Sequence, residues 1–501
     1  MNENSIETLV IVGGGTAGWM AAAGIKSFFN NNNIPIKITL VESEAIPPVG
    51  VGEASLPGLK TFNQSVGIDE IEFIKKTQAT FKLAIQFKDW HKKDSLFFHP
   101  FSKYGTTIND ISFHHYWMKD RFNGSQHSIQ DYSLSVAMCQ LKSFSPPDLD
   151  TNNPLSEYKY AYHFDAGLYA RLLKEHSLKL GVERIEGKIN STRLRENDGF
   201  IESVILEGGY ELSADLFVDC SGFKGLLIED ALNTGYTDWS NWLLCDRAIA
   251  IQTSSSATIN PYTTSRALDA GWSWHIPLQN RIGNGYVYSS QFVDNQYAQE
   301  TLIQTIEGKV LKEPKLLTFT PGMRKKFWNK NCVALGLASG FIEPLESTSI
   351  SLIQSGIIKL LMLFPDKTFK QALIDEANRL AQEEFERIRD FIILHYKATQ
   401  REDAELWRFV KNMSIPDSLS HKIEMYKEKG VFVKYLEESF TDESWLTIYS
   451  GFGIYPKKYD VRVDGVNSAS LSGYLKNMRN ALNDAAKKSI PHIEFIEKIY
   501  S

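Results

Sequence analysis

The sequence has few cysteines and no long uninterrupted apolar segment. Its four cysteines, at positions 139, 220, 245 and 332, lie far apart and form no Cys-x-x-Cys pair. We therefore expect no zinc site or other metal site and no disulfide framework, and reduced thiols favour a cytoplasmic protein. Leu9 to Ile25 carries no charge, but five glycines interrupt it. A strand, a loop and a helix explain this stretch better than a membrane span does.

An excess of basic residues is also missing. The chain has 54 Lys and Arg against 60 Asp and Glu, which gives a net charge of -6. Such a chain has no general attraction for nucleic acid or for an anionic membrane, and we predict neither as a partner. Residues 1–7 contain acids and no basic region, so we expect no signal peptide.

The 501 residues, 43% hydrophobic and 23% charged, are enough for a globular protein of two or three packed subdomains. Residues 91–155 are rich in His, Asp, Ser, Pro and aromatics with weak periodicity, which predicts an inserted, loop-rich lid over a substrate. Residues 1–90 and 156–366 are predicted to form the main module with the catalytic residues. Residues 367–501 are predicted to form a helical C-terminal subdomain on the substrate side.

A glycine-rich loop follows the first apolar run. Thr8 to Val12 is apolar and β-branched, glycines stand at 13, 15 and 18, and small residues continue to Ile25. A second apolar run, Ile36 to Val41, ends at Glu42. This order predicts a strand, a tight turn, a helix and a second strand, with the loop backbone against a pyrophosphate at the helix N-terminus. Glu42 is suited to accept hydrogen bonds from an adenosine ribose, so dinucleotide binding is predicted, with a plain glycine turn as the alternative.

Further segments predict elements around this unit. Residues 81–87 alternate, which predicts a strand with Phe81, Leu83, Ile85 and Phe87 on one face and Lys82 on the other. Residues 184–221 hold two glycine turns between short apolar runs and predict a β-meander. From about residue 367 onward, apolar side chains recur at helical spacing. The fold class is therefore α/β with a helical C-terminal part.

Four motifs resemble those of the flavin-dependent tryptophan/indole halogenase family. They are Gly50-Val51-Gly52-Glu53-Ala54-Ser55, Ala214 to Phe223, Trp272-x-Trp274-x-Ile276-Pro277 and Gly336 to Ser349. The resemblance implies an FAD-binding, Rossmann-like fold of the glutathione-reductase and aromatic-hydroxylase type, with the β-meander and the helical subdomain. It also implies that FAD, as FADH2, contacts Gly13, Gly15, Thr16, Ala17, Gly18, Glu42, Gly50, Val51, Gly52, Glu53, Ala54, Ser221, Gly222 and Leu337.

Lys82, in Thr80-Phe81-Lys82-Leu83, matches the family's essential lysine. In the family, FADH2, O2 and halide give hypohalous acid, which travels through a tunnel to this lysine. The lysine polarises the acid or forms a haloamine, and orients the halogen toward one aromatic carbon. An ammonium on a long, flexible stem suits this task. The alternative, which an arbitrary protein would favour, is an exposed strand lysine.

Glu346 matches the family's glutamate beside that lysine, where it either accepts the proton from the ring or hydrogen-bonds the hypohalous acid, with Glu343 as the competing carboxylate. Thr348 and Ser349 match the residues whose backbone amides hold the halide, chloride or bromide, at a helix N-terminus. The family's better-known tryptophan branch has Gly in place of Ser349, which leaves the halide preference open. Simple N-capping of the helix by Ser or Thr fits these residues equally well.

The Trp-x-Trp-x-Ile-Pro block is typical of halogenases among flavoproteins. By resemblance its four matched residues, Trp272, Trp274, Ile276 and Pro277, line the tunnel; two core aromatics are the alternative reading of the tryptophans. His99 and Phe101 match residues that pack on the substrate ring. The polar contacts that tryptophan-specific members make to the amino acid have no clear match near Ser444-Trp445 and Gly451-Phe452-Gly453. The predicted substrate is therefore a small electron-rich aromatic, such as indole or an indole derivative.

The resemblance implies a separate NAD(P)H-dependent flavin reductase as the source of FADH2, and it allows a homodimer. Two other functions compete with halogenation. A flavin-dependent aromatic monooxygenase would give hydroxylated product without halide, but leaves the matches at Lys82 and at residues 272–277 unexplained. A non-catalytic flavin-binding protein would need neither Lys82 nor Glu346.

Overall fold

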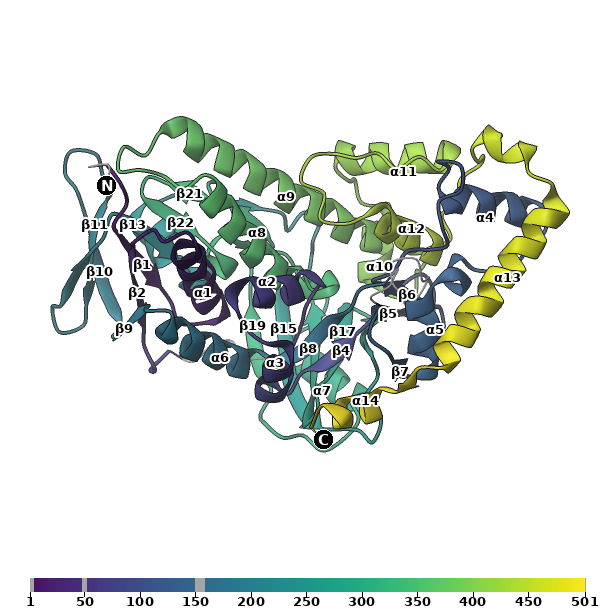
Figure 1. Ribbon diagram of the computed structural model, residues 1–501, viewed down its shortest axis with the longest axis horizontal. Helices are drawn as coiled ribbons and strands as arrows, with labels where there is room; N and C mark the ends of the chain where they lie inside the picture. The colour runs from purple at the N-terminus through teal and green to yellow at the C-terminus, as the bar shows by residue number, and fades with distance from the viewer. Residues whose placement is uncertain (1–3, 47–51, 149–157, 501) are drawn as a thin grey trace. The chain divides into compact units, whose positions relative to one another are not determined.

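The structure, a computed structural model, describes residues 4–46, 52–148 and 158–500, and the chain forms two compact units (Figure 1). The first unit comprises residues 1–79, 164–241 and 318–386, and the second comprises residues 80–163, 242–317 and 387–501. The chain therefore passes repeatedly from one unit to the other. The functional division predicted from the sequence, with boundaries near residues 90, 155 and 366, stays a prediction.

The first unit contains a six-stranded sheet of order β21-β22-β13-β1-β2-β9. All neighbouring strands are parallel except β21 and β22, which are antiparallel. The four residues of β13 and the last four of β1 are all buried, as expected for a parallel sheet covered on both faces. The strands are β1 Thr8–Val12, β2 Lys37–Glu42, β9 Glu183–Glu186, β13 Leu216–Asp219, β21 Trp328–Asn329 and β22 Cys332–Ala334.

Helices and short turns surround this sheet, and α1 packs against α6 and α8. The helices are α1 Thr16–Asn31, α2 Gly58–Val66, α3 Glu70–Thr77, α6 Ala166–Lys179 and α8 Thr348–Met362. The short turns are η3 Gly222–Lys224, η5 Gly336–Ala338 and η6 Pro344–Glu346, with a π-helical turn, η4 Leu226–Ala231. Short strands are β3 Gly52–Ala54, β14 Tyr236–Asp238, β20 Gly322–Arg324 and β23 Gly340–Phe341. The predicted strand, turn, helix and strand over residues 8–42 is confirmed.

The predicted β-meander is confirmed only in its centre. β10 Ile189–Leu194, β11 Ile201–Leu206 and β12 Glu211–Ser213 form an antiparallel three-stranded sheet. The flanking runs, β9 and β13, instead join the parallel sheet. β13 joins the parallel sheet because Leu216 to Val218 are all apolar. Both faces of this strand are therefore apolar and have to be buried.

The second unit contains a seven-stranded sheet of order β19-β15-β18-β17-β16-β5-β6. Neighbours from β15 to β6 are antiparallel except β16 and β5, which are parallel. A core of apolar and tyrosine side chains lies against it, including Ile249, Ile251, Tyr286 and Leu302. The strands are β5 Ala84–Lys88, β6 Leu96–Pro100, β15 Arg247–Ser254, β16 Tyr262–Leu268, β17 Gly271–Pro277, β18 Arg281–Tyr288 and β19 Lys315–Thr318.

Residues 81–87 are not one strand, so that prediction is wrong. β4, Thr80–Lys82, pairs with β8, Ala161–Asp165, whereas β5 belongs to the seven-stranded sheet. The chain changes sheet at Leu83, whose N–H donates to the Pro261 carbonyl at 2.7 Å. Lys82 is buried along with the apolar residues of the run, because β4 is covered on both faces. The alternative of an exposed strand lysine is therefore also wrong.

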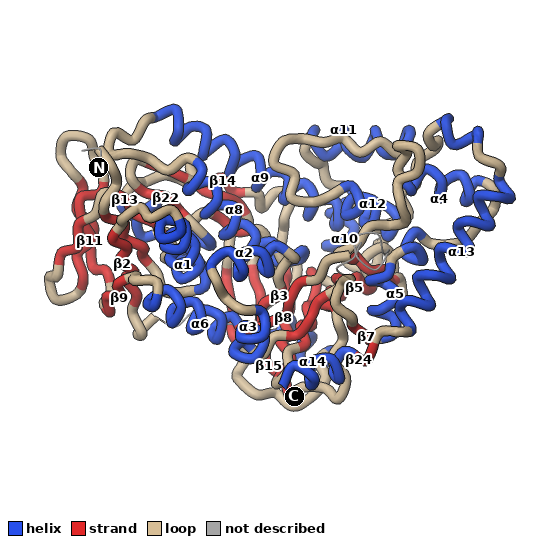
Figure 2. Tube along the Cα trace, viewed as in Figure 1, coloured by secondary structure: helices blue, strands red, loops and turns tan. Residues whose placement is uncertain are grey.

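The predicted loop-rich insertion is more regular than expected. Its described residues contain α4 Phe113–Phe122, η1 Ile129–Tyr132, α5 Leu134–Leu141 and the short strand β7 Ser143–Phe144. The predicted helical C-terminal part is confirmed, and Figure 2 shows its succession of helices. These elements are α9 Gln371–Lys397, α10 Glu405–Asn412, α11 Asp417–Lys429, α12 Asp442–Gly451, η7 Val461–Gly465, α13 Ser468–Lys487, β24 Ile490–Pro491 and α14 His492–Tyr500, with α7 Asn295–Thr305 earlier in the chain.

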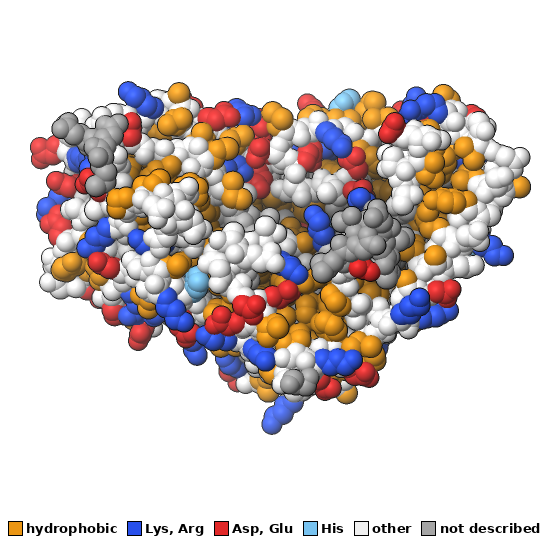
Figure 3. Space-filling model, viewed as in Figure 1, with side chains coloured by type: hydrophobic (Ala, Val, Ile, Leu, Met, Phe, Trp, Pro, Cys, Tyr) orange, Lys and Arg blue, Asp and Glu red, His pale blue; other side chains and the backbone are white. Residues whose placement is uncertain are grey.

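The four cysteines all lie in described parts of the chain, are buried, and form no disulfide. Among the described residues no group of three or more His, Cys, Asp and Glu side chains is placed to hold a metal ion. None of the helices in the described parts of the chain combines the length and the apolar character needed to cross a bilayer. Acidic and basic side chains are mixed over the face shown in Figure 3. This distribution agrees with the small net charge of the sequence.

Candidate active site

The glycine-rich loop of the first unit connects β1 to α1, and neighbouring backbone leaves no room for a side chain at Gly13 and Gly18. Gly13 has a φ of +111°, and a Cβ there would lie 2.3 Å from the carbonyl oxygen of Cys220. A Cβ on Gly18 would lie 1.8 Å from the carbonyl oxygen of Gly13. Gly15 differs, because a Cβ there would have no atom within 4 Å. The loop is therefore closely packed behind Gly13 and Gly18 and open beside Gly15.

The first turn of α1 offers its N–H groups to an anion. Gly15 is the N-cap and supplies no side chain, and no acidic residue stands in the first turn. These amides and the helix dipole therefore favour a negative group in the open space beside Gly15. A Cβ on Gly336, in the turn before Leu337, would lie 2.7 Å from the Cβ of Ala17. The turn that leads to Leu337 therefore packs against Ala17, and the open N-terminus of α1 fits the pyrophosphate of a dinucleotide.

Glu42 lies against the same loop. A Cβ on Gly14 would lie 1.7 Å from its Oε2. Oε1 accepts hydrogen bonds from Lys174 Nζ at 2.7 Å and Arg184 Nε at 2.5 Å, and Oε2 accepts one from Trp19 Nε1 at 3.2 Å. Burial acts to raise the pKa of Glu42, but the bonds from Lys174 and Arg184 outweigh it and hold the pKa below its ordinary value. The carboxylate is therefore ionised and fixed at the end of β2.

Asp219, which sequence reasoning did not select, fixes the second predicted cofactor loop. Its carboxylate is fully buried at the end of β13 and accepts hydrogen bonds from the backbone N–H groups of Ser221, Leu227 and Ile228 at 2.8–2.9 Å. Gly222 follows with a φ of +78° and open space at its Cβ position. The available signal was an acid that ends a buried apolar run, since such an acid must find several donors.

The motif at residues 50–55 is only partly described. Gly50 and Val51 lie outside the described residues, Gly52 begins β3, and Ala54 is buried. Burial raises the pKa of the partly buried Glu53 to about 7. This carboxyl is therefore largely protonated in mildly acidic solution, unlike Glu42.

The segment before α8 places several buried polar groups at a helix N-terminus. Glu343 and Glu346 are both fully buried, and Ser347 adopts a left-handed conformation with a φ of 60°. The Ser347 side chain makes no capping hydrogen bond, so the simple N-cap interpretation is not what the structure contains. Thr348 is 1% exposed and its Oγ1 has no hydrogen-bond partner among the described residues, while Ser349 is half-buried. The Thr348 hydroxyl and the backbone N–H groups of the first turn of α8 can donate to an anion at the helix N-terminus.

Lys82 ends β4 in the second unit and is fully buried. Its Nζ lies 5.1 Å from the centroid of the Phe101 ring, a cation–π distance. Phe101 is half-buried and directly follows β6. The structure therefore brings together two of the predicted site residues, an ammonium and an aromatic face, away from bulk water.

His99 lies in an aromatic cluster next to Phe101. It is 2% exposed, and its ring centroid lies 6.5 Å from that of Phe101, 5.9 Å from that of Phe391 and 6.4 Å from that of Phe440. Phe391 stacks on Phe440 at 3.9 Å and contacts Trp445 edge-on at 5.0 Å. Sequence reasoning missed Phe440, because a lone aromatic in a loop carries no periodic signal. Such a cluster suits a flat aromatic ligand.

Trp272 and Trp274 share one face of β17. They are 2% and 8% exposed, with ring centroids 6.2 Å apart. Across the strand pair, a Cβ on Gly285 would lie 2.1 Å from the Trp274 ring, so only glycine leaves room for that indole. Ile276 and Pro277 at the end of the strand are also buried. The four residues of the motif therefore form one packed element.

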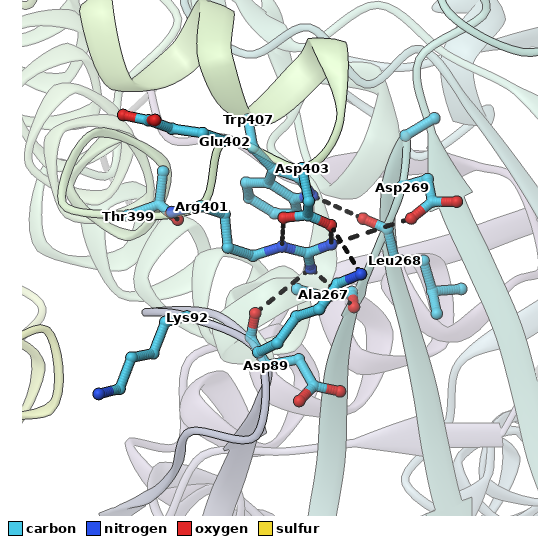
Figure 4. Close-up of polar contacts among 12 residues, drawn as sticks. Asp89, Lys92, Ala267, Leu268, Asp269, Thr399, Arg401, Glu402, Asp403 and Trp407 are labelled. Carbon is cyan, nitrogen blue, oxygen red and sulfur yellow. Dashed lines mark hydrogen bonds and ion pairs between the residues drawn. The ribbon is translucent and has the colours of Figure 1, made fainter.

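An ionic network around Arg401 lies against the Trp407 ring (Figure 4). Arg401 forms two hydrogen bonds with Asp403 and donates to the backbone carbonyls of Asp89 and Ala267. Its guanidinium lies 4.8 Å from the Trp407 ring, and Trp407 Nε1 donates to the Leu268 carbonyl. Trp90 contacts both Trp407 and Trp272. This buried network links the ends of β5 and β16 to the loop before α10.

Comparison with known proteins identifies the family. The model of the family "Tryptophan halogenase" matches residues 8–468. Tryptophan 6-halogenase ThaL of Streptomyces albogriseolus is 34% identical over 492 residues, which cover 91% of either chain. BrvH, a flavin-dependent halogenase from Brevundimonas sp. BAL3, has a TM-score of 0.96 at 44% identity and covers 99% of this chain and 100% of its own. A flavin-dependent halogenase from Xanthomonas campestris has a TM-score of 0.94 at 43% identity, covering 99% and 98% of the two chains.

These matches extend over nearly the whole chain and include both units. They agree with the dinucleotide-type loop and with the buried lysine beside aromatic rings. The α/β fold predicted from the sequence is confirmed, as is the resemblance that its motifs carried. This chain therefore belongs to the tryptophan halogenase family and is a flavin-dependent halogenase.

Proposed function

We propose that this enzyme uses FADH2 from a separate NAD(P)H-dependent flavin reductase to halogenate a small electron-rich aromatic compound, indole or an indole derivative. Chloride or bromide is the halide. The observation that supports this best is the fully buried Lys82, whose ammonium lies 5.1 Å from the Phe101 ring centroid beside the aromatic cluster of His99. The relative ThaL is by name a tryptophan halogenase, so an indole ring is the first substrate to test.

When bound, FADH2 supplies, with O2 and halide, the hypohalous acid that serves as electrophile. Lys82 donates a hydrogen bond to the oxygen of this acid, which weakens the bond between oxygen and halogen. An aromatic carbon attacks the halogen, the bond between oxygen and halogen breaks, and the oxygen takes a proton from the Lys82 ammonium and leaves as water. Glu346 accepts the proton that the ring loses, and return of this proton to Lys82 restores both groups. The sum is an aromatic C–H and hypohalous acid converted to an aromatic C–halogen bond and water.

The environment of Lys82 suits this role. A buried ammonium polarises a bound oxygen more strongly than an ammonium in water, because the local dielectric is lower. His99 and Phe101 hold the substrate ring by stacking and by covering its apolar faces. In this proposal Trp272, Trp274, Ile276 and Pro277 line the route by which hypohalous acid reaches Lys82. Their close packing suits a wall better than a reactant.

The first unit holds the cofactor and the halide in this proposal. The backbone of the Gly13 to Gly18 loop, with Thr16 and Ala17, binds the pyrophosphate, and Glu42 binds the ribose. The other predicted contacts are Gly50, Val51, Gly52, Glu53, Ala54, Ser221, Gly222 and Leu337. The amides of Thr348 and Ser349 bind the halide, and the Thr348 hydroxyl, which has no partner among the described residues, adds one more donor.

The test is product analysis of wild type and Lys82→Ala with indole, FAD, NADH, a flavin reductase and either bromide or chloride. We expect wild type to give haloindole, and the variant to give none while it binds FAD and oxidises FADH2 at the wild-type rate. Haloindole from Lys82→Ala at the wild-type rate would contradict the assigned role. An oxygenated product without halogen would indicate a monooxygenase, and no turnover under any condition would indicate a flavin-binding protein.

A further inference from the structure

Two fully buried histidines contact the three-residue strand that carries Lys82. His163 lies on β8 directly opposite Thr80 of β4, and His492 begins α14 near the end of the chain. Both belong to the second unit, as β4 does. A strand of three residues has few backbone hydrogen bonds of its own, so its position depends on such side-chain contacts.

The hydrogen bonds of Thr80 define the tautomer of His163. Thr80 Oγ1 donates to the Pro277 carbonyl oxygen at 2.7 Å, because a carbonyl only accepts. The hydroxyl has a single hydrogen, so at 3.0 Å from His163 Nδ1 its oxygen must accept. Nδ1 therefore carries the proton. The other ring nitrogen, Nε2, then accepts from the Thr263 hydroxyl at 2.9 Å.

His492 is fixed as the same tautomer by a different route. The backbone N–H of Phe81 donates to its Nε2 at 3.1 Å, so that nitrogen carries no proton. Nδ1 donates to the Ile259 carbonyl at 3.0 Å. The end of the chain thus contacts the backbone directly before Lys82. Phe144 and Phe495 pack on the Phe81 ring from the same region, with centroids 4.1 and 5.4 Å away.

Both imidazoles are neutral where they lie. Burial lowers the pKa of His492 to about 4 and that of His163 well below its ordinary value, and His163 also feels Lys82, His492 and His275. A proton on Nε2 of His492 would face the Phe81 N–H and break that bond. A charged His163 would add a second cation close to the Lys82 ammonium.

We propose that His163 and His492 are positioning residues that hold the lysine strand in register for halogen transfer. His163 acts through Thr80, and the same hydroxyl ties β4 to Pro277 at the end of the Trp-Ser-Trp-His-Ile-Pro strand β17. Two motifs that lie almost 200 residues apart in sequence are therefore joined by one hydroxyl group. This inference rests on the proposed role of Lys82.

The test separates formation of hypohalous acid from its use. Thr80→Val removes the hydroxyl at constant volume, and His492→Leu removes the acceptor for Phe81. We expect about a 10- to 100-fold lower rate of bromoindole formation in both, since small displacements of a reacting group cost that much. KM for indole, FAD binding and the rate of trapping of released hypobromous acid by monochlorodimedone should stay at wild-type values. His492→Gln, which keeps an acceptor, should recover most of the rate.

His114→Leu is the matched control. His114 is also buried in the second unit and hydrogen-bonded to a backbone carbonyl, that of Gly430, but it does not contact β4. We expect wild-type bromoindole formation from this variant.

Unchanged bromoindole formation in Thr80→Val would overturn the inference, and so would equal losses of bromoindole and trapped hypobromous acid. If His492→Leu does not fold, Thr80→Val decides. Lys82→Ala is run in parallel, because full activity there would refute the role of Lys82 and not the positioning contacts.

Discussion

At the scale of single residues, the N-terminus of α8 contains one buried hydroxyl, that of Thr348, which no described residue satisfies. Thr348 Oγ1 is buried without a partner among the described residues, and a buried hydroxyl in that state costs about 1–3 kcal/mol. A fold retains such a group where something else uses it. In the proposed function that use is the halide.

Thr348→Val tests this directly. Because the hydroxyl has no partner in the described protein, we expect the free energy of unfolding to stay unchanged or to rise by about 1 kcal/mol. KM for bromide should rise about tenfold, as one donor to the anion is lost. Urea unfolding and initial rates against bromide concentration give the two values. A clear loss of stability would show instead that the hydroxyl supports the fold.

Glu346 and Glu343 offer a matched pair, since both are fully buried and they lie three positions apart in the sequence. Glu346→Gln keeps the shape and removes the base, so we expect product formation to fall about 100-fold with flavin oxidation unchanged. Glu343→Gln should stay within about twofold of wild type. Chromatography of the haloindole product measures both variants. The reverse order of losses would move the general-base role to Glu343.

At the scale of elements, the loop between β1 and α1 contains glycines that are needed for two different reasons. Gly18 is needed because backbone occupies the place of its Cβ, whereas Gly15 leaves open space beside the uncapped helix N-terminus. The first is required by the fold and the second by the ligand that the fold is proposed to bind.

Gly18→Ala and Gly15→Ala should therefore fail differently. In Gly18→Ala the new methyl meets the Gly13 carbonyl, so we expect a loss of about 1–3 kcal/mol of stability or more. Gly15→Ala should fold with wild-type stability but bind FAD at least about tenfold more weakly, because its methyl fills the space for the pyrophosphate. Thermal unfolding and equilibrium dialysis with FAD distinguish these outcomes. Wild-type FAD affinity in Gly15→Ala would place the pyrophosphate elsewhere.

Local patterns predicted local structure well in this chain. The βαβ unit at residues 8–42 and the helical C-terminal part follow from periodicity and glycine placement. For residues 81–87 the same reasoning gave a wrong prediction of one strand. The alternation of apolar and polar residues continues through Leu83, but the backbone passes there from one sheet to another. Lys82 was found only through family resemblance, because nothing in its local pattern distinguishes it from a surface lysine.

At the scale of the whole molecule, contacts between distant parts of the sequence decide how the site residues are held. Lys174 and Arg184 lie 132 and 142 residues after the Glu42 that they pair with, and His492 lies 411 residues after Phe81. No spacing rule connects such residues, so sequence reasoning could name Glu42 and Lys82 but not what fixes them. The motifs of the site could be predicted from the sequence. The distant residues that hold the motif side chains in place could not.

Buried neutral histidines also make the whole fold sensitive to acid. The pKa of His492 is about 4 in the folded chain against 6.5 in the unfolded chain. Between these values the unfolded state binds one more proton, so stability from this group is complete above pH 6.5 and is lost as the pH falls to about 4. His163 and His114 act in the same direction, because burial lowers their pKa values too, whereas the raised pKa of Glu53 acts against them.

His492→Gln isolates one of these groups. We expect the free energy of unfolding of wild type, measured by urea titration from pH 4.5 to 6.5, to rise more steeply with pH than that of the variant. The difference in slope should be about 1.4 kcal/mol per pH unit, the value for one proton. Parallel curves would mean that His492 titrates alike in the folded and unfolded chains.

In the proposed function the enzyme makes a halogenating oxidant, and the burial of its four cysteines then has a consequence. Burial raises the pKa of Cys139, Cys220 and Cys332 well above the ordinary value, so these thiols stay protonated and out of contact with solvent. Oxidants attack accessible thiolates first. Hypohalous acid that escapes into solution therefore finds no exposed thiol on the enzyme. It oxidises exposed thioethers instead, such as that of Met362, which is 60% exposed. The burial of the cysteine thiols thus protects the catalytic lifetime of the enzyme.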